Sequence, residues 1–456
     1  MTKQQIYLVA SLCYIILFSV VNNTMFNVSL PTLAQEFELT PALVSWVMIG
    51  YGIVFAIGSV MYGKLADLFP VRRLIIIGLL LFSSGSVIGF FAPNYGVLIT
   101  GRVVQGAGAS AIPALSMIVA TRYFPVNMRG RIFGFVASTV AFGMGVGPIL
   151  GGAIAAMYGW KALFLFSIGS LLGLPFMGKH LPEDATAEGS LDVIGAVLFG
   201  VGSAALFMGV NLNSYLLLVA GVFLGLFFWR IRRVNNPFVR FDLLREPRYR
   251  LLLALGFSIF CTIGAFFFTI PIMLEAVHGS TAGGIGLVMF PGAMTSALLG
   301  SYVGRLSDRH GSPLIILCSA IMMLVGYALL SSLLHTSLWL VSMIMVAVYL
   351  GFSSLSTALG SYIPTTLAKE EVGIGTGLYN LINFMGSSMG TAWSSRLFES
   401  EPGRCNPFFK GSHPAFSNAF LLMLALVSLG LWFLYREQKK KESSASAAND
   451  ERALAE

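Results

Sequence analysis

The sequence has few charged residues. Only 11% of its 456 residues are Asp, Glu, Lys or Arg, whereas 56% are hydrophobic. A soluble domain carries about 25% charged residues. A chain with so little charge cannot present a polar surface to water on all sides, so the composition excludes a soluble globular protein and indicates that lipid surrounds most of the chain.

Cysteine and histidine are also scarce. Three of the four cysteines, Cys13, Cys261 and Cys318, lie inside apolar segments, and Cys405 lies in a polar one. They lack the spacing of a zinc site, and a single outward-facing thiol cannot build a disulfide framework. The five histidines are scattered without acidic partners at a useful spacing. We therefore expect no metal site, no cofactor and no enzyme active site.

Long apolar runs take the place of these polar features. A membrane-spanning helix needs about 20 mostly apolar residues. Fourteen runs are of this kind, at 6–27, 44–62, 74–93, 97–121, 132–157, 161–178, 192–211, 215–229, 251–274, 283–303, 313–333, 338–365, 374–397 and 417–435. The sequence thus predicts an all-α integral membrane protein with fourteen transmembrane helices.

Basic residues are concentrated in alternate loops between these runs. The formal net charge is +8, and with the N-terminus inside, most of the 28 Lys and Arg residues fall in the segments predicted to be cytoplasmic. Such a bias is typical of the cytoplasmic loops of membrane proteins. It predicts a multi-pass plasma-membrane protein with both termini in the cytoplasm. Nucleic acid is excluded as a partner, because there is no basic soluble module.

No acidic residue falls in the middle of a predicted span, but Arg102 lies inside the fourth. At 1.5 Å per residue it sits about 10 Å below the outer face. Ionisable groups are costly at such depth and mark function by default. We expect Asn22 and Asn23, at a similar depth in the first span, to hydrogen-bond its guanidinium; a purely structural staple between the two spans is the alternative.

One short motif occurs twice, from Gly63 with Asp67 and from Gly304 with Asp308. Each copy follows the second span of a six-span group, so two six-helix halves flank an inserted central helix pair. Parallel duplication of this kind is a transporter architecture. The predicted domains are an N-terminal half at 1–178, a central pair with a basic inner loop at 179–250, a C-terminal half at 251–435 and a disordered cytoplasmic tail at 436–456.

The repeated motif predicts a gate at the cytoplasmic face. A carboxylate at a helix end can complement a helix N-terminus and pair with Arg from a neighbouring helix. The candidate gating residues are Gly63, Asp67, Arg72, Arg73, Gly304, Asp308 and Arg309. Ordinary loop charge at the positive inner face is the alternative interpretation.

These motifs together resemble the major facilitator superfamily, in particular its fourteen-span drug:proton antiporter branch. The loop motif matches the superfamily's Gly-x-Leu-Ala-Asp, although Pro70 stands where the family has Gly. Arg102-Val-Val-Gln105-Gly106 is similar to the branch's Arg-x-x-Gln-Gly, and residues 143–152 are similar to the exporter signature Gly-x-x-x-Gly-Pro-x-x-Gly-Gly. The chain looks most like the Gram-positive tetracycline exporters.

The resemblance implies a secondary active efflux transporter, not an enzyme. It would export an amphipathic small molecule, tetracycline-like or several drugs, in exchange for protons by alternating access, as a monomer in membrane lipid. The candidate substrate or coupling residues are Arg102, Gln105, Asn22, Asn23, Asn380, Asn383 and Ser387. The exporter signature, with Gly143, Gly147, Pro148, Gly151 and Gly152, is expected to form a flexing helix between the halves; generic tight packing is the alternative.

The chain departs from the tetracycline exporters where they carry acidic residues within three spans. The matching positions are Asn23, Met144 and Ser387, and none of these side chains can carry a proton at working pH. An exporter or facilitator of an endogenous metabolite without proton coupling is therefore the alternative function. The mixed Asn, Ser, Phe and Met lining suits a neutral or weakly anionic amphipathic ligand.

Overall fold

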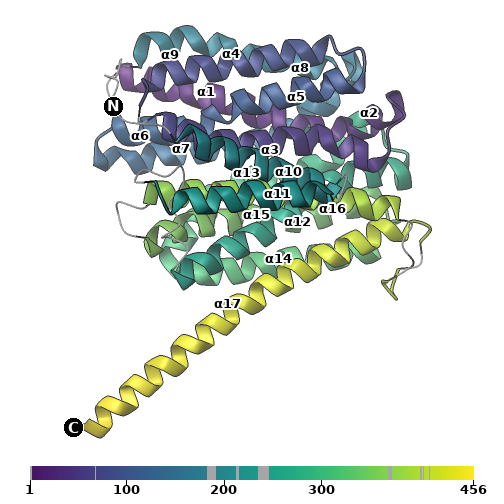
Figure 1. The fold of residues 1–456 in the computed structure, drawn as a ribbon. Coiled ribbons are helices and arrows are strands. Elements are labelled where there is room, and N and C mark those ends of the chain that lie inside the picture. The colour runs from purple at the N-terminus through teal and green to yellow at the C-terminus, as the bar shows by residue number, and fades with distance from the viewer. Residues whose placement is uncertain are drawn as a thin grey trace.

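Helices make up nearly all of the structure, a computed structural model shown in Figure 1. It describes residues 3–66, 68–181, 192–211, 215–234, 246–367, 372–400, 403, 405–409 and 411–455. Over these ranges the chain has no β-strand.

The first group of helices runs up to residue 180. Its elements are α1 (Lys3–Met25), the 3₁₀ turn η1 (Phe26–Ser29), α2 (Leu30–Glu36), α3 (Pro41–Leu65), α4 (Val71–Phe90), α5 (Tyr95–Ala109), α6 (Ala111–Arg122), α7 (Val126–Tyr158), α8 (Ala162–Ile168), η2 (Gly169–Gly173) and α9 (Leu174–His180). We call this group the N-half.

Two helices separate the N-half from a second group. They are α10 (Val193–Asn211) and α11 (Tyr215–Ile231). The second group, which we call the C-half, comprises α12 (Pro247–His278), α13 (Ala282–His310), α14 (Ser312–Ser332), α15 (Leu338–Tyr362), η4 (Ile363–Thr366), α16 (Val372–Glu399) and α17 (Pro414–Ala455).

Every apolar run predicted from the sequence lies on one helix or on consecutive helices. Within the described ranges, ten helical segments are long and apolar enough to cross a membrane, the first being the continuous 34-residue path from Lys3 to Glu36. Three shorter apolar helices lie at Ala162–Met177, Val193–Leu206 and Tyr215–Ile231. Length and apolarity therefore identify a multi-pass membrane protein.

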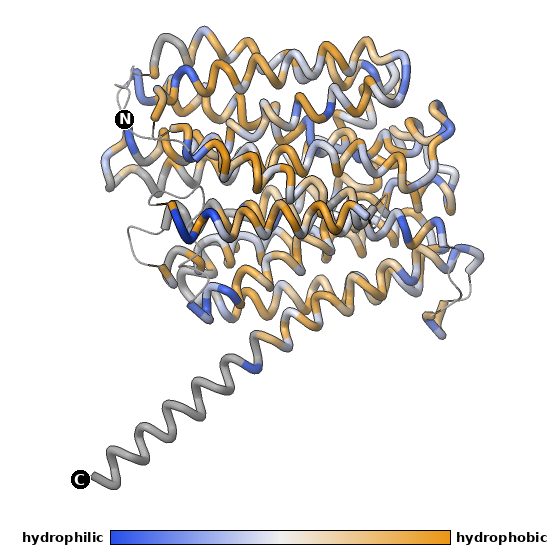
Figure 2. The backbone as a smooth tube through the Cα atoms, viewed as in Figure 1, coloured by the Kyte–Doolittle hydropathy of each residue, from blue (hydrophilic) through white to orange (hydrophobic). Residues whose placement is uncertain are grey.

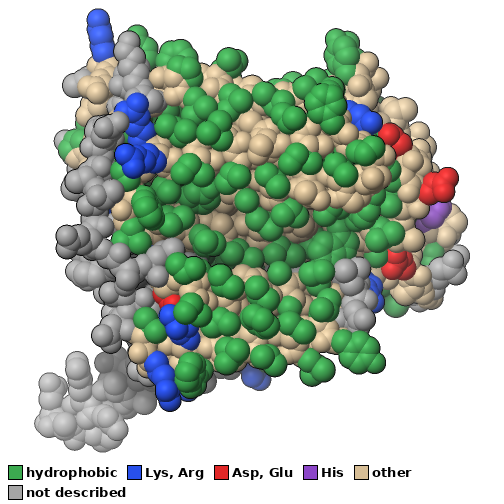
Figure 3. Space-filling view, turned by 45° about the horizontal axis from the view of Figure 1, so that its top comes forward, with side chains coloured by type: hydrophobic (Ala, Val, Ile, Leu, Met, Phe, Trp, Pro, Cys, Tyr) green, Lys and Arg blue, Asp and Glu red, His purple; other side chains and the backbone are tan. Residues whose placement is uncertain are grey.

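Charged and apolar side chains occupy different zones of the bundle. Apolar residues cover the bodies of the helices, and charged ones gather at the two ends (Figures 2 and 3). Leu218 and Leu298 on this apolar surface are 71% and 69% exposed, which suits contact with lipid. We call the end with Lys64, Arg122 and Arg230 the basic end, and the end with Glu36, Glu275 and Glu399 the acidic end.

The two halves repeat one packing pattern. In the N-half, α1 packs on α7, while α3 and α4 pack on α5; in the C-half, α12 packs on α16, while α13 and α14 pack on α15. The halves then meet crosswise, α7 against α13 and α3 against α16. We call these two contacts between the halves the α7–α13 seam and the α3–α16 seam. Helix α10 contacts α11 and also both α3 and α16, so the central pair lies over the α3–α16 seam.

The two copies of the repeated motif have different local structures. Helix α3 ends at Leu65, and the chain reaches Pro70 (φ −56°) before α4 begins. The second copy is not a loop, because α13 continues through it to His310 and turns at Gly311, whose φ of 89° favours glycine. Pro70 cannot adopt that φ, so the first copy cannot make the turn that Gly311 makes.

Several gating candidates fall outside what the structure describes. Gly63 lies on α3, and Arg72 and Arg73 lie in the first turn of α4. Asp67 lies outside the described residues, as do the side chains of Asp308 and Arg309, whose backbones belong to α13 with Gly304. The inner gate therefore stays a prediction.

The last helix extends into the segment for which the sequence predicts a disordered tail. Helix α17 continues without a break from Pro414 to Ala455, past residue 436 where the disordered segment was expected to begin (Figure 1). The tail is rich in Ala, Glu, Lys and Arg and contains no Pro or Gly. These residues are strong helix formers, so a polar composition here prolongs the helix.

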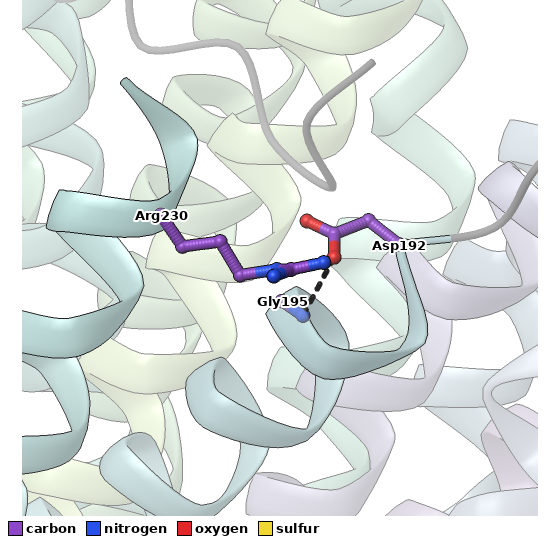
Figure 4. A network of polar contacts seen from close by, with 3 residues as sticks. All are labelled: Asp192, Gly195 and Arg230. Atoms are coloured by element: carbon purple, nitrogen blue, oxygen red, sulfur yellow. Dashed lines mark hydrogen bonds and ion pairs between the residues drawn. The ribbon is translucent and has the colours of Figure 1, made fainter. Parts of the chain in front are cut away.

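An ion pair at the basic end fastens the two central helices to each other (Figure 4). Asp192 Oδ1 accepts hydrogen bonds from the backbone N–H of Gly195 at 2.9 Å and from Arg230 Nε at 2.7 Å. The carboxylate thus caps the start of α10 and binds the end of α11. Its side chain is only 1% exposed, against 26% for Arg230.

We expect Asp192→Ala to lower the free energy of unfolding by about 1–2 kcal/mol, because both the cap and the partner of Arg230 are lost. Asp192→Asn should cost less, since the amide oxygen still accepts from Gly195. Thermal unfolding of the detergent-purified variants measures both. Equal melting temperatures for the parent and the Ala variant would contradict this role.

Candidate functional site

Arg102 lies on α5, completely buried in the N-half. Helix α5 starts at Tyr95 behind Asn94, whose side chain accepts from the N–H of Val97 at 3.1 Å. The guanidinium donates Nε to the carbonyl of Val47 at 3.1 Å. Its Nη1 donates to Asn22 Oδ1 at 3.1 Å and to Gln105 Oε1 at 2.9 Å. A charged donor therefore joins α1, α3 and α5.

Two aromatic rings enclose the same guanidinium. Its Cζ lies 4.3 Å from the ring centroid of Phe26 and 4.3 Å from that of Tyr51. Such cation–π contacts are worth about 2 kcal/mol when desolvated. Phe26 is the first residue of η1, so the 3₁₀ turn between α1 and α2 begins where the chain passes Arg102.

The partners of Arg102 are held by further polar side chains. Gln105 Nε2 donates to Ser86 Oγ at 2.7 Å, and Asn22 Nδ2 donates to Ser167 Oγ at 2.5 Å. The network therefore adds α4 and α8 to the three helices that Arg102 contacts. Gln105 has its amide oriented by two bonds, which fixes the acceptor that it presents to Arg102.

The predicted residues are only partly brought together here. Asn22 and Gln105 bind Arg102, as the sequence suggested for Asn22, but none of the guanidinium bonds that the structure describes goes to Asn23, which is half-buried. Ser86, Ser167 and the two rings were not predicted. Serine is common in apolar helices, and a buried aromatic residue gives no sequence signal of its own.

The network is not fully satisfied. Within the described part of the chain, Arg102 Nη2 is buried without a hydrogen-bond partner. Buried orphan donors are rare and costly, and those that persist are often at functional sites. One free donor on a desolvated cation makes this site a candidate for a coupling role rather than for packing alone.

A line of aromatic rings leads from Arg102 to the other half. Tyr51 stacks on Phe55 with a centroid separation of 5.7 Å, and Phe55 meets Phe384 of α16 at 4.4 Å. Phe384 belongs to the C-half, so this contact lies on the α3–α16 seam. Relative movement of the halves would therefore disturb the ring that covers Arg102.

The candidates on α16 lie mainly against α12 of their own half. Asn383 is 2% exposed, and a Cβ at Gly256 of α12 would stand 2.7 Å from its Oδ1. The backbone oxygen of Ser387 is close to Gly264 of α12, and Asn380 is half-buried. None of the hydrogen bonds described for the Arg102 network involves Asn380, Asn383 or Ser387, and their role at a substrate site stays a prediction.

The exporter signature places glycines on two faces of α7. Added Cβ atoms at Gly143, Gly147 and Gly151 would meet α1: 3.0 Å from Val20, 1.8 Å from Thr24 and 2.6 Å from Met25. The face toward α13 is built differently. A Cβ at Gly145 or Gly152 would meet the carbonyl of Ala293 at 3.0 Å or of Ala282 at 2.7 Å.

Helix α7 is therefore closely packed on two faces, against α1 of its own half and against α13 of the C-half. Pro148 lies inside α7, and its carbonyl is 2.6 Å from where a Cβ at Gly286 of α13 would be. Proline removes a helix hydrogen bond and permits bending, and small residues let backbones approach. Both alternatives offered by the sequence, bending and tight packing, fit this geometry.

Two similarly packed helical halves in an apolar bundle, joined by close helix contacts, are an architecture of multi-pass membrane transporters. The family model described as Major Facilitator Superfamily matches residues 12–391. The chain belongs to this family.

Curated relatives are similar over most of their length. The "Riboflavin transporter RibZ" of Clostridioides difficile (strain 630) is 26% identical over 458 residues, covering 97% of this chain and 100% of the relative. The "Multidrug resistance protein Stp" of Mycobacterium tuberculosis (strain CDC 1551 / Oshkosh) is 27% identical over 402 residues, covering 84% and 75%.

Solved structures share the fold. A POT family transporter in complex with a thioalcohol conjugated peptide superposes with a TM-score of 0.72 at 16% identity, covering 94% of this chain and 96% of the other. A bacterial homolog of the human lysosomal transporter Spinster, in an inward-facing and unoccupied conformation, has a TM-score of 0.66 at 13% identity, with coverage of 95% and 96%.

Proposed function

We propose that the protein is a secondary active exporter of an amphipathic small molecule, a tetracycline-like drug or several drugs, in exchange for protons. The observation that carries the proposal is the position of the exporter signature. Gly145, Pro148 and Gly152 lie at the backbone contact between α7 and α13. A contact without intervening side chains lets two halves rock against each other, which is the movement that alternating access requires.

The proposal includes a fourteen-span arrangement with the N-half, the C-half and the central pair α10–α11. The repeated packing pattern supports it, as does the position of α10 over the α3–α16 seam. Both chain ends leave at the basic end (Figure 1), and the positive-inside bias makes that the cytoplasmic side of the plasma membrane. We propose a monomer, in which one chain supplies both halves.

A second candidate is an exporter or facilitator of an endogenous metabolite without proton coupling. Among the side chains that the structure describes, the buried charged ones are Arg102 and Asp192, and Asp192 is bound at the basic end. Among the described residues, no buried carboxylate lies in mid-bundle to carry a proton. The relative named for riboflavin transport favours this candidate, and the one named for multidrug resistance favours the first.

Transport into proteoliposomes under imposed pH and voltage gradients separates the two candidates. We expect accumulation of tetracycline-like compounds that collapses when an uncoupler removes the pH gradient, with Arg102→Ala as the inactive control. Counterflow of riboflavin that is indifferent to the pH gradient would favour the metabolite transporter. Drug accumulation that persists in de-energised vesicles would refute proton-driven export.

A further inference from the structure

The acidic end contains two polar contacts between the halves, on either side of a single turn. Gln35 of α2 donates its Nε2 to Glu275 Oε1 at the end of α12. Glu399, the last residue of α16, accepts the backbone N–H of Ala42 in the first turn of α3 at 3.2 Å. Residues 35–42 of the N-half are thus held between two carboxylates of the C-half.

Each contact has a clear electrostatic basis. Ala42 follows Thr40, the N-cap of α3, and its N–H is one of the free donors at a helix start. A carboxylate there binds the positive end of the helix dipole as well as the N–H. Glu275 binds an amide donor, and a bond with one ionised partner is stronger than a neutral one.

The turn itself is rigid and firmly attached to the N-half. After α2 the N–H of Leu39 bonds the carbonyl of Ala34 at 2.8 Å, which closes the helix with Glu38 at φ 51°. Glu38 is the one non-glycine residue with positive φ among those described. Trp160 Nε1 donates to Glu36 Oε2 at 2.5 Å, which pins α2 to the start of α8.

The other seam is also closed at this end. Gly152 of α7 lies against the first turn of α13, where a Cβ would stand 3.4 Å from the Cα of Gly283 and 3.4 Å from that of Gly286. Both seams between the halves are therefore in contact where Glu275 and Glu399 bind the turn.

From this arrangement we infer that Glu275 and Glu399 form an acidic-end clasp, a gate opposite the one that the repeated motif predicts. The clasp holds the α2–α3 turn and keeps the acidic end shut in the conformation seen here. Breaking it shifts the protein toward the state that opens at this end. The inference rests on the proposed alternating-access function, but it concerns a conformational equilibrium that exists without substrate.

The distance between the halves at the acidic end tests the clasp. Spin labels at Lys161→Cys in the N-half and Ser337→Cys in the C-half, with the four native cysteines replaced, report that distance by double electron–electron resonance in nanodiscs. Both sites are exposed. We expect the combined Glu275→Ala and Glu399→Ala variant to raise the long-distance population roughly tenfold, and each single variant about threefold.

Glu38→Ala is the matched control. It removes a carboxylate from the same turn but belongs to neither contact, and alanine keeps the Cβ at the positive φ. Unchanged distances in this control support the clasp. An equal shift in the control, or no shift in the combined variant, overturns it. The measurement needs no substrate, so failure to transport any tested compound would leave its result standing.

A cross-link covers the case in which the combined variant does not fold. Gln35→Cys with Glu275→Cys, joined by a short bifunctional thiol reagent in the background without native cysteines, should leave only the short-distance population; positions 161 and 337 then carry spin labels on a ketone-bearing unnatural amino acid instead of cysteine. Reduction of a cleavable linker should restore the parent distribution. A cross-linked protein that still samples the long distance refutes the clasp.

Discussion

Arg102→Lys is expected to reduce transport to background although it keeps the positive charge. Lysine has no planar group to lie between Phe26 and Tyr51, and its three donors cannot reproduce the fork that reaches Val47, Asn22 and Gln105. At least one buried acceptor then lacks a partner. We expect the free energy of unfolding to fall by about 3 kcal/mol.

Tyr51→Phe is the matched variant. It keeps the ring over the guanidinium and removes only the buried hydroxyl. Stability should stay close to that of the parent, because the contact between the ring and Arg102 is kept. Thermal unfolding in detergent and proteoliposome uptake, measured on both variants, give the two readouts.

The two variants also show whether Arg102 only holds helices together or takes part in coupling. If Arg102 only fastens helices, transport should recover when a stabilising background restores the melting temperature of Arg102→Lys. If the guanidinium takes part in coupling, transport stays lost in that background. Wild-type transport by Arg102→Lys in the parent background, without added stabilisation, would contradict both roles.

Helix positions were predictable because the apolar runs have the length of a membrane crossing, and the chain follows them closely. The breaks inside helices were not. Helices α5 and α6 separate at Ser110, one 3₁₀ turn follows the first run at Phe26–Ser29, and another interrupts the sixth run at Gly169–Gly173. These breaks depend on neighbours far along the chain, which hydropathy does not report.

The candidate site shows the same limit at the level of single residues. Counting residues along two helices placed Asn22 and Arg102 at one depth, and they do bond. Consecutive residues on a helix point about 100° apart, so Asn23 could not share that role. For the α16 residues, the side chain of Asn383 and the backbone of Ser387 lie close to glycines of α12, a neighbour that the sequence did not indicate, and their place at a substrate site stays a prediction. The depth of a residue in the membrane can be predicted from a single sequence, but which helices pack against each other cannot.

Gly152→Ala is expected to slow transport about tenfold and to shift the halves apart at the acidic end. Its Cβ would stand 2.7 Å from the carbonyl oxygen of Ala282, a backbone atom of α13 that cannot rotate away. The helices must separate, and overpacking of this kind costs about 1–3 kcal/mol. The cost falls on the conformation in which α7 and α13 touch, so the equilibrium between conformations changes.

Two further glycine variants serve as controls for the effect of Gly152→Ala on the distance between the halves. Gly151→Ala would place a Cβ 2.6 Å from Met25 on α1, in the same half; it should lower the melting temperature but leave the distance between the Lys161 and Ser337 labels unchanged. Gly225→Ala on α11, with nothing within 4 Å, should be neutral or stabilise by about 0.5–1 kcal/mol through helix propensity. If Gly151→Ala shifts the distance between the labels, or if Gly152→Ala does not, then the two faces of α7 do not differ in their roles in stability and in movement. The expected split instead assigns stability of the N-half to one face and movement between the halves to the other.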